Sequence, residues 1–139
     1  MKQGLTLMEV LIVLAIVAIL GAILVPNFIT ATNRARLRAD VQSTMVIQQM
    51  MDLYNAERGA TITTSRSAEE VIQRLVETGR LAEGQDHIPQ IADATFELYN
   101  HRLVLNLSTS VSTGIRNNAS NWLTENELRY VRIAPTTGG

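Results

Sequence analysis

The first thirty residues of the chain contain an unbroken apolar segment. All sixteen residues from Val10 to Val25 are apolar, and the longer stretch Leu5–Val25 has only Thr6 and Glu9 as polar residues. A helix of these 21 residues is about 31 Å long at ~1.5 Å per residue, which matches the ~30 Å hydrocarbon core of a bilayer. The pattern therefore predicts a membrane-spanning helix.

A helical pattern continues from Asn27 to Arg58, and Gly59 then supplies a stop signal. Apolar residues recur here at three- and four-residue spacing and predict an apolar stripe made of Val46, Ile47, Met50, Met51, Leu53 and Tyr54. We expect the opposite, solvated or subunit-facing side to carry Arg34, Arg36, Arg38, Asp40, Gln42, Gln48 and Gln49. Because the pattern resumes beyond Pro26, we expect that proline to kink one long helix and not to end it.

The rest of the chain predicts a small head of helix and strands. Ser67 and Glu70 form a capping-box pattern that starts a short helix, which Thr78-Gly79 ends. Apolar residues then alternate with polar ones, which predicts two strands that contain Phe96, Leu98, Leu103, Leu105 and Leu107. We expect a two-residue hairpin turn at Asn100-His101 between them, and a third strand over Glu127–Ala134.

The connecting segments are expected to be irregular. Ala60–Arg66 and Ser108–Ser120 are predicted loops, Arg80–Gln90 is rich in turn residues, and Pro135–Gly139 is a loose tail. The predicted fold class is therefore α+β, with a long N-terminal helix packed on a small antiparallel sheet.

Composition narrows the possible functions. The 139 residues fit one domain, the formal net charge is −1, and there is no cysteine. A charge near zero argues against a nucleic-acid binder that works by bulk electrostatics. Without cysteine the chain has no disulfide and no thiolate site.

The apolar segment permits more than one role. No small-residue cleavage site follows Val25, so a cleaved secretory signal fits poorly; a simple anchor and an anchor processed before the apolar run remain. Glu9 helps to distinguish the simple anchor from the processed anchor. A carboxylate in a spanning helix costs about 2.5–3.5 kcal/mol at mid-bilayer, so its presence requires a reason. Either Glu9 lies at headgroup level, or it pairs with a cation from a partner such as another copy of this helix. We favour the pairing, because a simple anchor has no use for that charge.

The N-terminal segment resembles the class III signal of the type IV filament superfamily. The resemblance rests on Gly4-Leu5-Thr6-Leu7-Met8-Glu9, the apolar run and Pro26. This superfamily comprises type IV pilins, type II secretion pseudopilins and competence pseudopilins. The resemblance implies cleavage between Gly4 and Leu5 and N-methylation of Leu5, although Leu5 stands where phenylalanine is commonest in the family. It also implies that Glu9 pairs with the N-terminal amine of a neighbouring subunit and that Pro26 serves assembly.

The resemblance implies partners and a location as well. The partners are a prepilin peptidase that is also the N-methyltransferase, further copies or other pilin-like subunits, and an inner-membrane assembly platform. Before assembly the chain would cross the membrane once, with a cytoplasmic N-terminus and the head outside; afterwards it would lie in a cell-surface or periplasmic filament. Arg34, Arg36 and Arg38 lie beyond the span, so the positive-inside rule by itself favours the opposite topology or leaves the topology open; the N-inside orientation rests on the resemblance.

These expectations divide the chain into five parts. Residues 1–4 are a leader, 5–26 a transmembrane assembly helix and 27–58 its amphipathic continuation. Residues 59–134 form the α+β head, and 135–139 a flexible tail.

The sequence carries no pattern of catalytic or metal-binding residues. His87 and His101 have no partner at metal-ligand spacing, and Ser108–Ser120 holds no acidic residue for calcium. We therefore expect no cofactor, no metal and no enzyme activity. Four arginines, Arg102, Arg116, Arg129 and Arg132, would bind DNA phosphate if they converged on one exposed face, but scattered solvated charges are the favoured interpretation.

The leading hypothesis is a structural subunit of a type IV pilus-like filament. A competence (DNA-uptake) pseudopilin and a type II secretion pseudopilin are alternatives, and the missing cysteines and acidic loop disfavour the secretion type. A monomeric membrane-anchored binding domain, or an enzyme whose site carries no familiar motif, is the alternative from another class.

Overall fold

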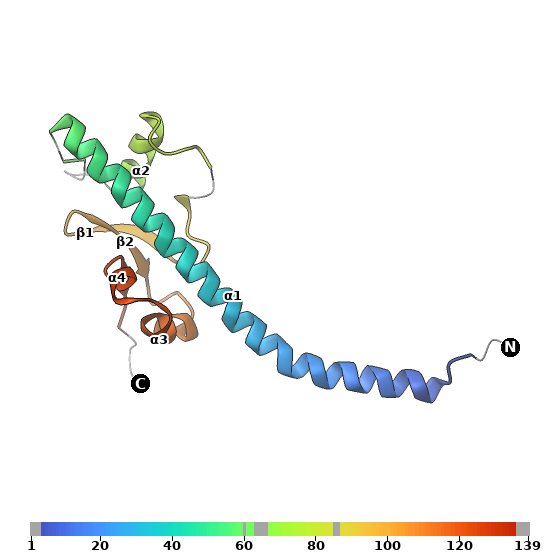
Figure 1. The fold of residues 1–139 in the computed structure, drawn as a ribbon. Helices are drawn as coiled ribbons and strands as arrows, with labels where there is room; N and C mark the ends of the chain where they lie inside the picture. The colour runs from blue at the N-terminus through green and yellow to red at the C-terminus, as the bar shows by residue number, and fades with distance from the viewer. Residues whose placement is uncertain (1–3, 60, 63–66, 85–86, 136–139) are drawn as a thin grey trace. The chain divides into compact units, whose positions relative to one another are not determined.

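The computed structural model describes residues 4–59, 61–62, 67–84 and 87–135. In chain order the elements are α1 (Leu7–Arg58), α2 (Ala68–Glu77), β1 (Thr95–Tyr99), β2 (Arg102–Leu107), α3 (Thr113–Trp122), α4 (Glu125–Leu128) and β3 (Val131–Ile133). The chain divides into two compact units, Met1–Asn33 and Arg34–Gly139, and α1 contributes to both (Figure 1). The predicted α+β class is confirmed.

Helix α1 is 52 residues long and contains Pro26 in its interior. The prediction that the helix continues past Pro26 is therefore confirmed. It ends where the glycine signal places the stop, since Gly59 adopts a left-handed φ of 64° and its N–H donates to the carbonyl of Asn55 at 2.9 Å. That conformation costs glycine little, because it has no Cβ.

The head, the name used here for Arg34–Gly139, packs one face of its sheet on α1. Leu103, Leu105 and Leu107 alternate along β2 and are each 0% exposed, as period-two spacing requires. Their core splits into two clusters. One gathers Leu37 and Val41 of α1 with Leu105 and Leu107; the other gathers Ile47, Met51 and Tyr54 with α2 and Leu103.

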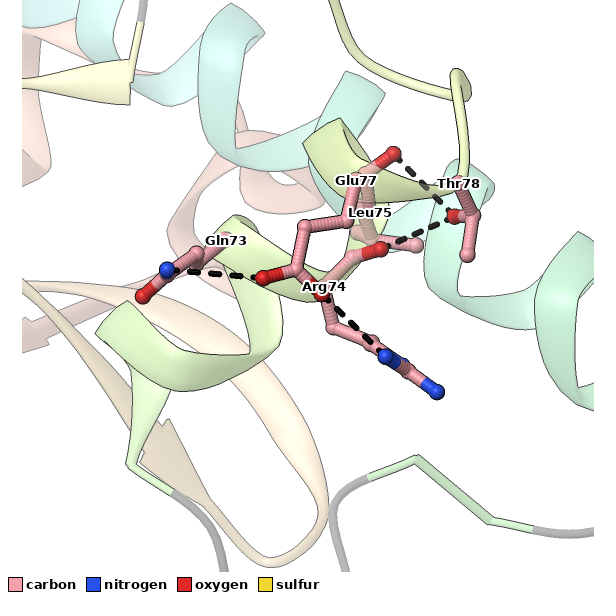
Figure 2. A network of polar contacts seen from close by, with 5 residues as sticks. All are labelled: Gln73, Arg74, Leu75, Glu77 and Thr78. Carbon is pink, nitrogen blue, oxygen red and sulfur yellow. Dashed lines mark hydrogen bonds and ion pairs between the residues drawn. The ribbon is translucent and has the colours of Figure 1, made fainter.

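Local signals set the ends of α2 and the hairpin as predicted. Ser67 and Glu70 form a capping box, with the Glu70 N–H donating to Ser67 Oγ at 3.2 Å. At the other end, Figure 2 shows Thr78, whose hydroxyl donates to the carbonyl of Arg74 at 2.9 Å. Asn100 and His101 take φ values of 50° and 63°, the two left-handed positions of a tight hairpin turn.

The third strand differs from the prediction in its direction. β1 and β2 pair antiparallel, but β3 pairs parallel with β2, with Leu105 opposite Val131. The cause is the connection: α3 and α4 carry the chain back across the sheet before β3 begins, and such a crossover produces parallel neighbours. The expected strand over Glu127–Ala134 is also shorter, because Thr124 and Glu127 form a capping box that starts α4.

The polar segment Ser108–Ser120 was predicted to be a loop, but this is wrong for its second part. The helix α3 begins at Thr113. Val111, Ile115 and Ala119 lie four residues apart and are all buried in the core. Four-residue spacing places Ile115 and Ala119 on one face of α3, and Val111 lies just before the helix, so a few apolar residues are enough to bury this otherwise polar segment. The predicted loop Ala60–Arg66 and tail Pro135–Gly139 lie mostly outside the described residues, as does part of Arg80–Gln90.

The predicted stripe on α1 is wrong for two of its six members, Val46 and Leu53, whereas Ile47, Met51 and Tyr54 are buried and Met50 packs against them. Val46 and Leu53 are 47% and 48% exposed, whereas Asp40 and Gln48, expected on the solvated side, are 2% and 7% exposed. Asp40 accepts the backbone N–H groups of Gln90 and Ile91 at 2.7 and 2.9 Å. The side-chain oxygen of Gln48 accepts the N–H of Leu103 at 2.8 Å.

These two polar side chains replace missing backbone partners. The N–H of Leu105 in β2 donates to the carbonyl of Tyr130 at 2.7 Å, but β3 pairs only with Leu105–Leu107 of β2 and leaves Leu103 uncovered. A buried N–H without an acceptor costs about 1–3 kcal/mol, and Gln48 removes that cost. Asp40 does the same for the segment that leads into β1.

We expect Asp40→Asn to destabilise the head by about 1–3 kcal/mol, because an amide keeps one acceptor and turns a donor toward the second N–H. Urea unfolding of the full chain in detergent, followed by the fluorescence of Trp122, measures the change. The exposed Asp93→Asn is the matched control. A loss of unfolding free energy no larger than that of the control would show that Asp40 does not stabilise the segment with Gln90 and Ile91.

The difference in stability between the wild type and Asp40→Asn should also depend on pH. Burial raises the pKa of Asp40, more than the N–H groups of Gln90 and Ile91 and the charge of Arg36 lower it. The folded state therefore takes up a proton at a higher pH than the unfolded chain, so the wild type gains stability as the pH falls toward the ordinary aspartate pKa of about 3.9. The difference between wild type and Asp40→Asn should widen over that range.

Candidate functional site

The first turn of α1 is closed by a capping box. The N–H and the hydroxyl of Thr6 donate to Oε2 of Glu9 at 2.8 and 3.1 Å. In return the N–H of Glu9 donates to Thr6 Oγ1 at 3.3 Å. Thr6 is thus the N-cap and Glu9 the third helical residue, which is the reciprocal pattern of S/T-x-x-E.

This local role of Glu9 was missed from the sequence. The spacing that identified Ser67 and Glu70 is also present at Thr6 and Glu9, and it was the signal available. The capping box occupies only one carboxylate oxygen: within the described residues, Oε1 of Glu9 accepts no hydrogen bond. Oε2 of Glu9 therefore has a hydrogen-bond partner at the start of its own helix, and Oε1 is available to a second donor.

The first half of α1 is apolar on every side. Four successive residues from Leu11 to Leu14, which point in four directions around the helix, are between 51% and 58% exposed. An 18-residue window of α1 has a mean hydropathy of 3.0, and none of it is buried. The helix is thus long and apolar enough to cross a membrane. An apolar helix of this kind requires lipid or other helices around it.

The helix continues through Pro26, and side chains next to it bond to carbonyls of the preceding turn. Pro26 has no N–H to donate to the carbonyl four residues earlier. On the next residues the side chain of Asn27 donates to the carbonyl of Ile23 at 3.1 Å, and the Thr30 hydroxyl donates to that of Pro26 at 3.1 Å. Such side-chain bonds to the preceding turn often bend a helix. The kink at Pro26 stays a prediction.

Gly4 and Leu5 precede the helix and are exposed, while residues 1–3 of the expected leader lie outside the described part of the chain. The peptide bond between Gly4 and Leu5 is therefore two residues from the first helical residue, Leu7. Both residues of that bond lie outside α1, and cleavage between them stays a prediction.

The structure does not bring all four arginines considered for DNA binding to one exposed face, although Arg102, Arg129 and Arg132 are exposed. Arg116 is 8% exposed, and its Nε donates to the carbonyl of Val111 at 3.0 Å. Arg102 and Arg132 stack on the rings of Tyr130 and Tyr99. The residues that the structure describes contain no group of three or more His, Asp or Glu placed to hold a metal ion.

Comparison with known proteins finds a family match at the N-terminus and similarity to two curated proteins. Residues 1–25 match the family described as the prokaryotic N-terminal methylation motif. The chain is 24% identical over 72 residues to the type II secretion system core protein G of Escherichia coli, covering 52% of this chain and 50% of that protein. It is 41% identical over 56 residues to PilA4, the type IV wide pilus major component of Thermus thermophilus, covering 38% of this chain and 43% of that protein.

The resemblance that the N-terminal residues carry is thereby confirmed. The chain spans about half the length of these relatives or less. No solved structure is significantly similar to it.

We expect Thr6→Ala to loosen the first turn of α1 without altering the charge of Glu9. Loss of an N-cap hydroxyl typically costs about 1 kcal/mol, so the first-turn amides should exchange about fivefold faster. Hydrogen exchange of the full chain in micelles measures this. Unchanged exchange at residues 7–10, against Thr30→Ala as a control further along the helix, would contradict the capping role.

Proposed function

We propose that this protein is a structural subunit of a type IV pilus-like filament. The observation that carries the proposal is the first half of α1, which is apolar on every side and begins with a methylation motif. A helix of this kind is stable in two environments, a bilayer and a dry bundle of similar helices. The subunit is therefore stored in the membrane and transferred into the filament core without exposing α1 to water.

Glu9 supplies the specificity of that transfer. Cleavage after Gly4 creates an amine at Leu5, and methylation keeps its positive charge. The free Oε1 of Glu9 accepts from the Leu5 amine of a neighbouring subunit, while Oε2 remains in the capping box with Thr6. A misplaced register leaves both charges unpaired in apolar surroundings and costs several kcal/mol.

Processing and topology follow from the same scheme. A prepilin peptidase cleaves the leader at the cytoplasmic face and methylates Leu5, and an inner-membrane platform adds the subunit to the filament. The head lies outside the membrane, Pro26 bends α1 as subunits pack, and the role is structural, without catalysis.

A type II secretion pseudopilus is the second candidate. It is favoured by the longer similar stretch, 72 residues against 56. Both candidates require the same N-terminal processing.

Intact mass and N-terminal peptide mapping of the protein from its native membrane test the processing. We expect the loss of Met1–Gly4 and the addition of one methyl group on Leu5. Gly4→Leu should leave the leader in place, because a side chain at this position obstructs the peptidase, while Gly84→Ala, in the head, should be processed normally. An intact leader in the wild type, from cells with active peptidase, would leave only a plain membrane anchor.

Glu9→Gln separates the charge of Glu9 from its capping role. Glutamine also serves in the third position of a capping box, so the variant should keep its helix start and its cleavage but lose assembly. Thr6→Ala is the matched variant: it loses the cap, keeps the charge and should still assemble. Filament yield after shearing, measured by electron microscopy and immunoblot, decides between them. Normal filaments from Glu9→Gln would refute the pairing with the neighbouring amine.

A further inference from the structure

The residues that follow the predicted membrane span carry an unbalanced charge. The juxtamembrane segment, defined here as residues 27–39, contains Arg34, Arg36 and Arg38 and no acidic residue. The next acid along the chain is Asp40, which is 2% exposed and accepts the N–H groups of Gln90 and Ile91. The segment is therefore positively charged; Arg36 interacts with the charge of the buried Asp40, and Arg38 interacts with that of Glu127 in α4.

The three arginines differ in what they contact. Arg38 is engaged within the head, since its Nε and Nη2 donate to the carbonyl of Trp122 at 3.3 and 3.1 Å. Arg34 and Arg36 are exposed, and in the described part of the chain neither forms a hydrogen bond or an ion pair. The charge of Arg36 lowers the pKa of Asp40, but burial opposes this more strongly. Two guanidinium groups are thus left for an external anion.

The length of α1 places them close to a bilayer surface. Arg34 follows Val25 by nine residues of unbroken helix, about 13 Å along the axis at ~1.5 Å per residue. Helical side chains lean toward the N-terminus, here toward the membrane. The polar headgroup layer extends about 5–7 Å beyond the hydrocarbon, and charge interactions reach about another 8 Å at physiological ionic strength.

We propose that Arg34 and Arg36 dock the head on anionic phospholipid headgroups while the subunit is stored in the membrane. The proposal rests on the membrane storage proposed above and adds the lipid partner. An anionic bilayer fits better than a protein surface, because only eight residues separate Arg34 from Val25, the end of the apolar span. Each basic residue near such a surface should shift the ratio of docked to undocked heads about fivefold. The contact is weak enough to be released on assembly.

Trp122 is the only tryptophan of the chain and is held by Arg38 of the juxtamembrane segment, so it reports on this contact. The full chain is reconstituted in vesicles of phosphatidylcholine, or of phosphatidylcholine mixed with phosphatidylglycerol. Both contain a lipid with a nitroxide on its headgroup, which quenches nearby tryptophan. We expect stronger quenching of Trp122 in the anionic vesicles, and we expect added salt to reduce it toward the neutral value.

The double variant Arg34→Gln/Arg36→Gln should lower the quenching in anionic vesicles to the level of neutral ones. Arg102→Gln/Arg132→Gln removes the same charge from the outward face of the sheet and should leave it unchanged. Equal quenching of the wild type in the two vesicle types, or no effect of Arg34→Gln/Arg36→Gln, would overturn the lipid contact. A chain that alkaline carbonate strips from the vesicles would overturn the membrane anchor itself, so the two failures are distinguishable.

Discussion

The structure depends on one helix, α1, whose two halves require different surroundings. The first half of α1 exposes apolar side chains on every side and needs lipid or other helices around it. The second half buries one side under a sheet and leaves the other in contact with water. Backbone hydrogen bonding inside α1 lets one element pass from one medium to the other, because a helix satisfies its own N–H and C=O groups in either.

The head is fixed to α1 by polar contacts as well as by its core. Asp40 and Gln48 lie among buried leucine, valine and isoleucine side chains, yet each accepts backbone N–H groups that no strand reaches. In a three-stranded sheet whose third strand covers only part of β2, Gln48 supplies the acceptor for Leu103 of β2, and Asp40 supplies acceptors for the segment before β1. The small sheet therefore relies on the second half of α1 for hydrogen bonds, and the two belong to the same compact unit.

Glu9 shows how a charge in an apolar segment serves both a local and an assembled state. In the single chain it closes the first turn of α1 with Thr6 through one oxygen. Its second oxygen is available to the neighbouring amine that the proposed filament provides. Since the capping box already orients the carboxylate, pairing with a neighbour requires little reordering of the side chain.

The sequence by itself determined the features that depend on near neighbours in the chain. These are the apolar span, the helix continuing through Pro26, the capping box at Ser67, the left-handed turn at Asn100-His101 and the N-terminal motif with Gly4, Leu5 and Glu9. Only the tertiary structure decided the burial of Asp40 and Gln48, the helix over Thr113–Trp122 and the parallel direction of β3. Each of these depends on a partner 50 or more residues away, as between Asp40 and Gln90, or on a crossover whose path local periodicity does not contain. Local patterns specify which elements form, but the unpaired backbone groups of distant segments decide which polar side chains become part of the core.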